Sequence, residues 1–271
     1  MLNTFALSLK QALATWPSWA RVSEQSLKRQ PQVLKQLVGG LTNQNYLLDA
    51  DGHQLVLRLN TVDHARMGID RYREQEVLSI LAGEALVPAL IYCQPDTGLL
   101  VSRYVEGRHW AADELHDQEK WESLLLVLGQ VHATQGNLPN FDYQAHIENY
   151  WKQLQASGRE DKSSSRVYRQ AQVSLKYLAN LYNNVPRVLC HHDPGPLNMI
   201  ERETGALVLL DWEYAGGGWP VMDDTALIRQ WQPACQLRKI LRLSSYSEEE
   251  FYAAHNIWAF IDLAWYQLRR T

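Results

Sequence analysis

Two short stretches with apolar residues lie next to each other early in the chain. Residues 45–49 and 54–59 flank Asp51-Gly52, a turn dipeptide whose glycine tolerates a positive φ. The pattern predicts a β-hairpin. In its second strand alternate leucines would face one way and Arg58 the other, because side chains of a strand alternate between its two faces.

Apolar spacing also divides the rest of the chain into elements. In chain order we expect a helix with a loop over the first 36 residues, a helix over 73–81, a strand over 99–104, helical segments from 119 to 181, strands at 188–190, 199–200 and 206–210, and helices at the end. A sheet-rich lobe over residues 1–105 and a mainly helical lobe over residues 106–271 is the most economical reading, so we expect an α+β fold.

Composition excludes several classes of protein. The chain has 271 residues, with 26 Lys and Arg against 30 Asp and Glu, and this balance argues against a dedicated nucleic-acid binder. No apolar stretch approaches the length of a membrane span, so we expect no membrane insertion. The first residues lack the features of a signal peptide, and the three cysteines, Cys93, Cys190 and Cys235, form neither a disulfide framework nor a zinc pattern. We therefore expect a cytoplasmic protein.

A first candidate for chemistry is a buried charge on the predicted helix 73–81. Glu74 shares a helix face with Val77 and Leu78, and a carboxylate on an apolar face is costly unless it is paired. Arg58, on the strand just upstream, is a plausible partner. Taken alone, the two residues are better explained by a structural ion pair or a partly exposed glutamate.

The densest signal is the segment from Leu189 to Asn198, followed by Asp211. If residues 199–210 form an antiparallel hairpin, Asn198 and Asp211 meet at one end of it, with Asp193 on the preceding loop. Oxygen ligands of this kind suit Mg²⁺, which leaves positions for phosphate oxygens. A further carboxylate could accept a proton from a hydroxyl nucleophile.

Two other interpretations of this segment stay open. Pro194, Gly195 and Pro196 could merely make a rigid turn that Asn198 caps. His191 and His192 could instead form part of a transition-metal site with Asp193, although adjacent residues at a strand end point to opposite sides.

These residues resemble a known family. His191-His192-Asp193 with Asn198 and Asp211 is similar to the H-x-D-x-x-x-x-N plus D signature of the aminoglycoside phosphotransferase and choline kinase superfamily, relatives of protein kinases. Further segments resemble family motifs in the same order: the nucleotide loop at 38–46, the glutamate helix at 73–81, the adenine-binding hinge at 103–107, a helix ending in Leu-His at 128–132, and at 211–216 the Asp-Trp-Glu-Tyr-Ala run of choline and thiamine kinases. The resemblance covers roughly residues 37 to 270.

The resemblance implies a protein-kinase-like two-lobed fold, with an N-terminal antiparallel β-sheet lobe carrying a helix and a larger, mainly helical C-terminal lobe. It implies that Asp193 is the catalytic base, that Asn198 and Asp211 bind Mg²⁺, and that Arg58 contacts phosphate while Glu74 holds it. The other nucleotide-binding residues that it implies are Gly39, Gly40, Thr42, Asn43, Ser102 and Tyr104.

A helix face near the C-terminus is a candidate for acceptor binding. Trp258, Asp262 and Trp265 share one face, and two indoles beside a carboxylate suit a cationic ligand. Core packing of the indoles, with Asp262 paired to Arg269 or Arg270, explains the pattern as well.

Three residues that follow Asp211 in the sequence complete the list of candidate site residues. Trp212 and Glu213 follow it directly and could contact the acceptor, while Asp224 resembles a family position that braces the catalytic loop.

We therefore expect an ATP- and Mg²⁺-dependent kinase that phosphorylates choline, thiamine or a similar cationic alcohol. An aminoglycoside phosphotransferase is the alternative within the class, ranked lower because the chain ends in basic residues. From other classes, a nucleotide- or metabolite-binding pseudokinase and a metal-dependent hydrolase remain. The expected partners are ATP and the alcohol, and the oligomeric state is left open.

Overall fold

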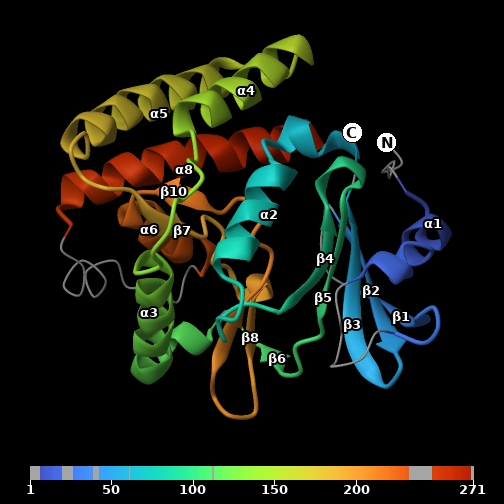
Figure 1. Cartoon of the computed structure of the whole chain (residues 1–271). Coiled ribbons are helices and arrows are strands. Elements are labelled where there is room, and N and C mark those ends of the chain that lie inside the picture. Colours follow the sequence, from blue (N-terminus) through green and yellow to red (C-terminus); the bar gives the residue numbers. More distant parts are fainter. Residues whose placement is uncertain are drawn as a thin grey trace. The chain divides into compact units, whose positions relative to one another are not determined.

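The computed structural model describes residues 7–19, 27–38, 43–60, 62–111, 113–231 and 246–269 (Figure 1). The chain divides into two compact units. The first contains residues 1–65, 69–108 and 200–213, and the second contains residues 66–68, 109–199 and 214–271. Residues 200–213 thus belong to the first unit, although they lie far beyond the boundary expected at residue 105.

The helices and strands keep the order expected from the sequence. The α-helices are α1 (Leu9–Leu13), α2 (Arg71–Ile80), α3 (Gln118–His132), α4 (Tyr143–Ala156), α5 (Lys162–Leu181), α6 (Pro220–Gln230) and α8 (Glu248–Arg269). The strands are β1 (Gln32–Leu37), β2 (Asn43–Ala50), β3 (His53–Asn60), β4 (Leu90–Gln94), β5 (Leu99–Arg103), β6 (Arg108–His109), β7 (Val188–Cys190), β8 (Met199–Glu201), β9 (Leu207–Leu209) and β10 (Gly216–Gly218). Short 3₁₀ turns connect several of them.

A five-stranded antiparallel sheet forms the centre of the first unit, in the order β1-β2-β3-β5-β4. The predicted hairpin is confirmed as β2 and β3, and both Asp51 (φ 53°) and Gly52 (φ 86°) have the positive φ of a tight hairpin turn. On β3 the alternate leucines are buried in one core with α1, while Arg58 lies on the opposite face of the strand. Figure 1 shows α1 and α2 on opposite faces of this sheet.

Helix α2 begins at an Asp70 N-cap, whose carboxylate accepts hydrogen bonds from the amides of Tyr72 and Arg73. The helix buries Glu74, as the helical phase predicted, and leaves Glu76 exposed. The strand and the helix therefore direct Arg58 and Glu74 toward each other.

Several strands differ from the expectation, since β4, β6 and β10 were not expected and β1 replaces a helical segment. Residues 32–37 were expected within a helical segment, but they form β1, which pairs with β2. Five of the six residues of β1 are exposed, and the register shifts between Val33 and Lys35. Because this bulged edge strand is exposed, it has no buried face that would require apolar and polar residues to alternate. The spacing of its apolar residues therefore resembled that of a helix and led to the wrong prediction.

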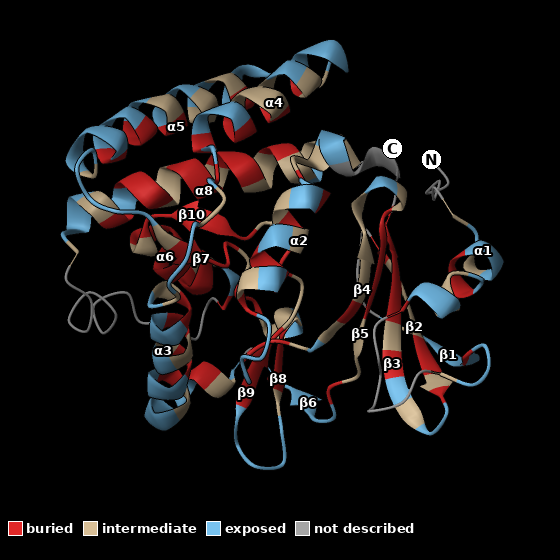
Figure 2. Ribbon diagram, in the orientation of Figure 1, coloured by how far each residue is buried: buried red, intermediate tan, exposed pale blue. Residues whose placement is uncertain are grey.

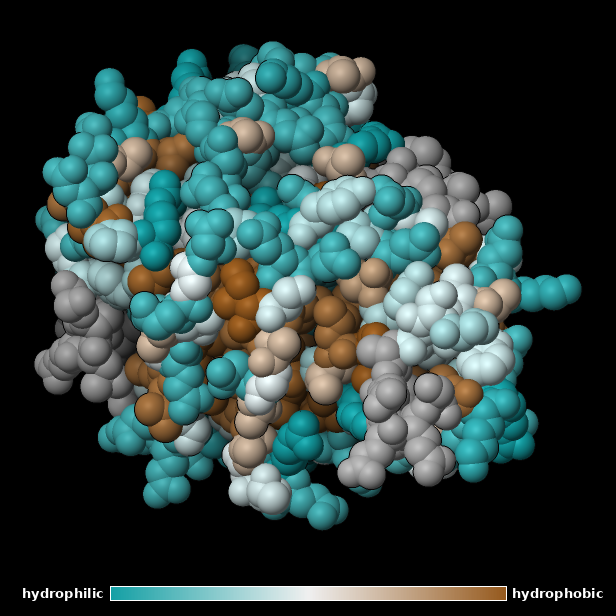
Figure 3. Space-filling view, in the orientation of Figure 1, coloured by the Kyte–Doolittle hydropathy of each residue, from teal (hydrophilic) through white to brown (hydrophobic). Residues whose placement is uncertain are grey.

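The second unit is mainly helical, as expected. Its core includes residues from α4, α5, α6 and α8, and Figure 2 shows the middle of α8 buried among its neighbours. The outward surface of α4 and α5 is mostly hydrophilic (Figure 3). In this unit β7 pairs with β10, which places the start of the loop after Cys190 beside the glycines 216–218.

A small sheet of order β6-β8-β9 contains the strands that were expected at 199–200 and 206–210. Gly205 has a φ of 82° in the turn between β8 and β9. No helix in the described part of the chain is long and apolar enough to cross a membrane.

Candidate active site

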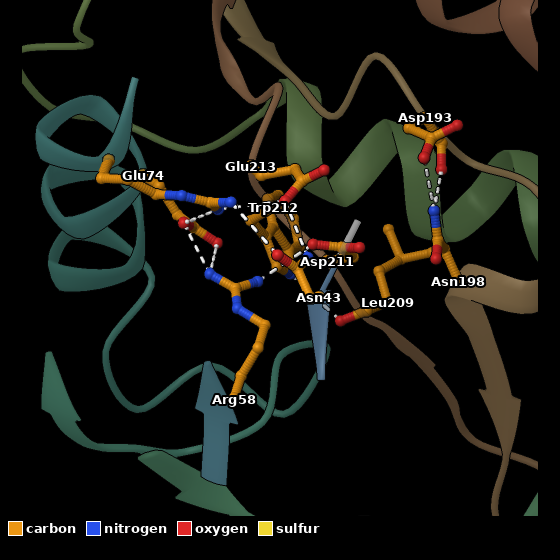
Figure 4. Close-up of polar contacts among 10 residues, drawn as sticks. Asn43, Arg58, Glu74, Asp193, Asn198, Leu209, Asp211, Trp212 and Glu213 are labelled. Atoms are coloured by element: carbon orange, nitrogen blue, oxygen red, sulfur yellow. Dashed lines mark hydrogen bonds and ion pairs between the residues drawn. The ribbon is translucent and has the colours of Figure 1, made fainter. Parts of the chain in front are cut away.

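A cluster of buried charges lies in the first unit, between β3, α2 and the segment after β9 (Figure 4). The Arg58 guanidinium donates to both oxygens of Glu74 (2.6 and 2.7 Å) and to Asp211 Oδ1 (3.0 Å). Arg58 is 7% exposed and Glu74 2% exposed. The predicted pair of Arg58 and Glu74 is confirmed, and it is a buried ion pair rather than a partly exposed glutamate.

Three further residues extend the cluster. Arg71, one turn before Glu74 on α2, donates to Glu74 Oε2 (2.9 Å) and to Glu213 Oε2 (3.0 Å). Asn43, at the start of β2, donates from its amide nitrogen to Glu213 and accepts from Arg71. Glu213, expected near an acceptor, is thus buried in the first unit and neutralised by Arg71.

The electrostatics of the cluster favour an additional cation. Two guanidiniums, of Arg58 and Arg71, face three carboxylates, of Glu74, Asp211 and Glu213. Burial would raise the pKa of Glu74, but the two guanidiniums outweigh it and hold that pKa below its ordinary value.

For Asp211 the balance is reversed, because burial and the Glu213 carboxylate raise its pKa well above the ordinary value despite Arg58. The Asp211 side chain is the one in the cluster with substantial exposure, 29%. A carboxylate in negative surroundings that is still open to solvent fits a hard divalent cation such as Mg²⁺.

In the second unit, the loop after β7 carries Asp193 and Asn198. The Asn198 amide nitrogen donates to the Asp193 carboxylate (2.6 Å) and to its backbone carbonyl (3.0 Å), as Figure 4 shows. The amide of Gln230, at the end of α6, donates to the other carboxylate oxygen. The Asn198 nitrogen is thus occupied, which leaves its oxygen as the atom that could coordinate a metal ion.

A buried carboxylate of α6 holds the start of this loop. Asp223 accepts hydrogen bonds from the backbone amides of His191 (2.9 Å) and His192 (2.6 Å) and from the His132 ring (2.9 Å). Burial alone would raise the pKa of Asp223, but these hydrogen bonds and the nearby imidazoles lower it to about 2.

Asp224 was expected to brace the loop, but this expectation is wrong. The preceding residue, Asp223, accepts the hydrogen bonds from the loop. Burial raises the pKa of Asp224 to about 6, and its carboxylate hydrogen-bonds with Tyr246 rather than with the loop. Adjacent residues of a helix point about 100° apart, so only Asp223 faces the loop.

Backbone strain marks the same two segments. Only three residues other than glycine have a positive φ in the described part of the chain. Asp51 is in the hairpin turn, whereas His192 (φ 67°) directly precedes Asp193, and the third is Asp211 (φ 57°). Such conformations cost free energy and are concentrated at functional sites.

The nucleotide-binding residues inferred from the resemblance are only partly described. Gly39, Gly40 and Thr42 lie outside the described residues. Ser102 is on β5, paired with Val56 of β3, and the Tyr104 amide donates to the Gln54 carbonyl. Sheet pairing therefore occupies the Tyr104 N–H, and its carbonyl remains as the backbone group that could meet a purine.

The expected acceptor residues of α8 have partners within the second unit. Asp262 receives two hydrogen bonds from Arg229 of α6, a partner that was not expected, and Arg270 lies outside the described residues. The Trp258 indole is 7% exposed and donates to the Met222 carbonyl (2.9 Å), and Trp265 packs against the core with the Arg269 guanidinium over its ring. These contacts favour core packing.

Trp212, in the first unit, is also a core residue. It is 2% exposed, and its indole N–H donates to the Leu209 carbonyl (3.0 Å). It anchors the segment that carries Asp211 and Glu213.

The transition-metal interpretation of His191, His192 and Asp193 receives no support from the geometry. Among the described residues, the group that gathers three metal-ligating atoms consists of His132, Cys190 and Asp223. Burial raises the pKa of the Cys190 thiol well above its ordinary value, and this opposes the thiolate that a metal needs.

Sequence reasoning missed several residues that orient the charged groups. Arg71 and Gln230 were not singled out, and Asp223 was passed over in favour of its neighbour. The helical phase could have found Arg71, since it lies three residues before Glu74 on the same face of α2. Nothing local in the sequence indicates the contact of Gln230 with Asp193.

Comparison with known proteins places the chain in a family. It is 24% identical to Protein LicA of Haemophilus influenzae over 234 residues, which cover 80% of this chain and 66% of LicA, so the chain spans about two thirds of that relative's length. The structure is similar to choline kinase LicA from Streptococcus pneumoniae, with a TM-score of 0.71, 23% identity and coverage of 87% of this chain and 86% of that one.

Two further structures are similar. LicA in complex with AMP has a TM-score of 0.72 and 23% identity, with coverage of 89% and 85%. A thermostable mutant of aminoglycoside phosphotransferase APH(4)-Ia has a TM-score of 0.64 and 19% identity, with 88% of each chain covered. The expected protein-kinase-like fold is confirmed. Residues 33–264 match the model of the phosphotransferase enzyme family, and the chain belongs to that family.

Proposed function

We propose that this protein is an ATP- and Mg²⁺-dependent kinase that phosphorylates the hydroxyl group of a small cationic alcohol, with choline and thiamine as the leading acceptors. Family membership supports phosphoryl transfer. The observation that carries the proposal is the pair of strained residues, His192 and Asp211, at the two segments that bear the candidate base and a candidate metal ligand.

Asp193 serves as the base in this proposal. Two amide groups, of Asn198 and Gln230, donate to its carboxylate and fix its direction. An ionised carboxylate can accept the proton of a hydroxyl group as that oxygen attacks the γ-phosphorus, and the bond from phosphorus to the bridging oxygen of ADP breaks. Phosphoryl transfer needs little more from the protein than positioning and charge stabilisation.

Asn198 and Asp211 would hold Mg²⁺, which supplies positive charge to the phosphate oxygens when it is bound. Arg58 faces Asp211 with one arm of its guanidinium and Glu74 with the other. Glu74 thereby holds Arg58 in the extended position from which a guanidinium can contact phosphate. Arg71 neutralises Glu213 nearby, and Asn43 donates a hydrogen bond to it.

The cationic acceptor is proposed from the relatives and from the run 211–216, not from α8. LicA from Streptococcus pneumoniae is a choline kinase. Because Arg229 already neutralises Asp262, that carboxylate does not attract a cation without first losing its partner. An aminoglycoside remains the second acceptor class to test, since an aminoglycoside phosphotransferase is also structurally similar.

The test measures ADP release with MgATP across choline, ethanolamine, thiamine, several aminoglycosides and simple sugars. We expect saturable release with one acceptor, near-complete loss in Asp193→Ala with ATP binding kept, and loss of Mg²⁺-dependent nucleotide binding in Asp211→Ala. The exposed Asp113, whose side chain makes no capping hydrogen bond, provides the control Asp113→Ala.

Each outcome separates the hypotheses. Turnover that survives in Asp193→Ala would remove Asp193 as the base. MgATP binding without turnover on the whole panel would favour a nucleotide-binding pseudokinase. Tight Zn²⁺ binding without any nucleotide binding would favour a metal-dependent hydrolase instead.

A further inference from the structure

His192 occupies a backbone conformation that residues other than glycine seldom adopt. Its φ of 67° lies in the left-handed region, where the Cβ of an L-residue approaches the following carbonyl. The peptide that follows it leads directly into Asp193. Any relaxation of the His192 backbone toward a negative φ would turn that peptide and carry the Asp193 carboxylate away from its present direction.

Hydrogen bonds at both nitrogens hold the His192 ring. Nδ1 lies 2.9 Å from the Tyr214 carbonyl, and because a carbonyl only accepts, Nδ1 carries the proton. In the neutral ring Nε2 is then an acceptor, and the Tyr143 hydroxyl lies 2.6 Å from it and donates to it. The Trp219 amide donates to the same Tyr143 oxygen (3.4 Å).

Burial and ring packing stabilise the hydrogen bond between Tyr143 and His192. Tyr143 and His192 are each 2% exposed. The Phe141 ring lies against the His192 ring, with centroids 4.3 Å apart, and Trp219 is stacked on Tyr143 at 5.0 Å. Burial raises the pKa of Tyr143 well above its ordinary value, so its hydroxyl keeps the proton that it donates.

Gly218 leaves the space that this contact needs. A Cβ at Gly218 would stand 2.4 Å from the Tyr143 oxygen and 2.8 Å from His192 Nε2. Any larger residue there would push the two side chains apart.

We propose that Tyr143 is a positioning residue, which acts through its hydrogen bond to His192 to hold the strained backbone that directs Asp193. The proposal rests on the proposed role of Asp193 as the base. Asp223 accepts hydrogen bonds from the amides of His191 and His192, so Tyr143 restrains the His192 side chain while Asp223 restrains the backbone.

The test is a kinetic and thermal double-mutant cycle. Tyr143→Phe is made in the wild-type protein and in a His192→Gly background, where glycine adopts a positive φ without strain and needs no hydrogen bond to keep it. Tyr150→Phe is the matched control, because Tyr150 lies on the same helix, is fully buried and donates its hydroxyl to the Met67 carbonyl, away from the loop.

We expect Tyr143→Phe to lower kcat roughly 10- to 100-fold, the scale of a misdirected catalytic group, with KM values for ATP and acceptor unchanged. Tyr150→Phe lowers the unfolding temperature but leaves kcat unchanged. In the His192→Gly background, Tyr143→Phe has little further effect on either kcat or the unfolding temperature. His192→Asn, which tolerates a positive φ, keeps more kcat than His192→Val.

Equal kcat in Tyr143→Phe and Tyr150→Phe would overturn the positioning role while leaving the proposed kinase intact. An undiminished effect of Tyr143→Phe in the His192→Gly background would also overturn it, because the hydroxyl would then act without His192. If the wild-type protein turns over no acceptor, the proposed function and the positioning role fail together, and the unfolding temperatures still show whether the hydrogen bond holds the turn.

Discussion

Removing the charge of Glu74 gives a sharp test of the buried cluster. Glu74 accepts three hydrogen bonds, at 2.6 and 2.7 Å from Arg58 and at 2.9 Å from Arg71, and it is 2% exposed. Glu74→Gln keeps the shape of the side chain. It removes the negative charge, and it replaces one acceptor oxygen with an NH₂ group that faces the donors of a guanidinium.

The expected loss of unfolding free energy follows from the charges that remain in the cluster after Glu74→Gln. Two buried guanidiniums would keep only Glu213 and Asp211 as anionic partners. Breaking a buried ion pair from one side costs about 3–5 kcal/mol, because the other charge stays buried without compensation. Since a protein of this kind has a total stability of about 5–15 kcal/mol, we expect the unfolding temperature to fall by about 6–20 °C.

Urea denaturation followed by tryptophan fluorescence measures this loss. The control is Glu76→Gln, on the exposed face of the same helix, where surface substitutions stay within about 0.5 kcal/mol. The comparison should be repeated at low pH. The pKa of Glu74 is lowered in the folded state, so its contribution is complete above its ordinary value of 4.5 and is lost as the pH falls through the lowered value.

Equal losses in Glu74→Gln and Glu76→Gln would refute the reasoning. So would a difference between Glu74→Gln and the wild-type protein that persists undiminished in strong acid, since Glu74 is then protonated in both states of the wild-type protein.

Three other predictions concern separate parts of the chain. Because the pKa of Asp223 is about 2 against an ordinary 3.8, the wild-type protein should lose about 2 kcal/mol of unfolding free energy between those pH values, and Asp223→Asn should not show this loss in acid titration followed by urea denaturation. Gly107→Ala should cost about 1–3 kcal/mol in urea denaturation, because Gly107 has a φ of 152° and a Cβ would lie 2.3 Å from the Glu201 carbonyl; a neutral effect would contradict this. Asp262→Asn should cost under about 1 kcal/mol, since its pair with Arg229 is partly exposed, and it should leave the acceptor KM unchanged; a large rise in KM would restore Asp262 as an acceptor ligand.

The local sequence pattern was sufficient to predict those elements in which one buried face makes apolar residues recur at the spacing of a strand or a helix. The hairpin of β2 and β3 followed from alternation and a turn dipeptide, and the pairing of Arg58 with Glu74 followed from strand alternation combined with helical phase. In each case the residues lie close in sequence or on one periodic element, so the chain itself carries the geometric information.

Local pattern failed where the partner is distant or the surface is exposed. The contact of Arg71 with Glu213 joins residues 142 positions apart, and nothing near either one indicates the other. The choice between Asp223 and Asp224 depends on the rotation of α6, which packing fixes. Likewise, Asp262 pairs with Arg229 on another helix, and the spacing of residues along α8 does not indicate that partner.

The order of synthesis has a consequence for the first unit. Its buried cation Arg71 is completed by Glu213, which the ribosome adds 142 residues later. At about 5–20 residues per second this is a delay of roughly 7–30 s, during which most of the helical unit is also made. The sheet of the first unit is therefore made before its charge balance is complete, and Arg71 lacks the Glu213 carboxylate until residues 200–213 have been added.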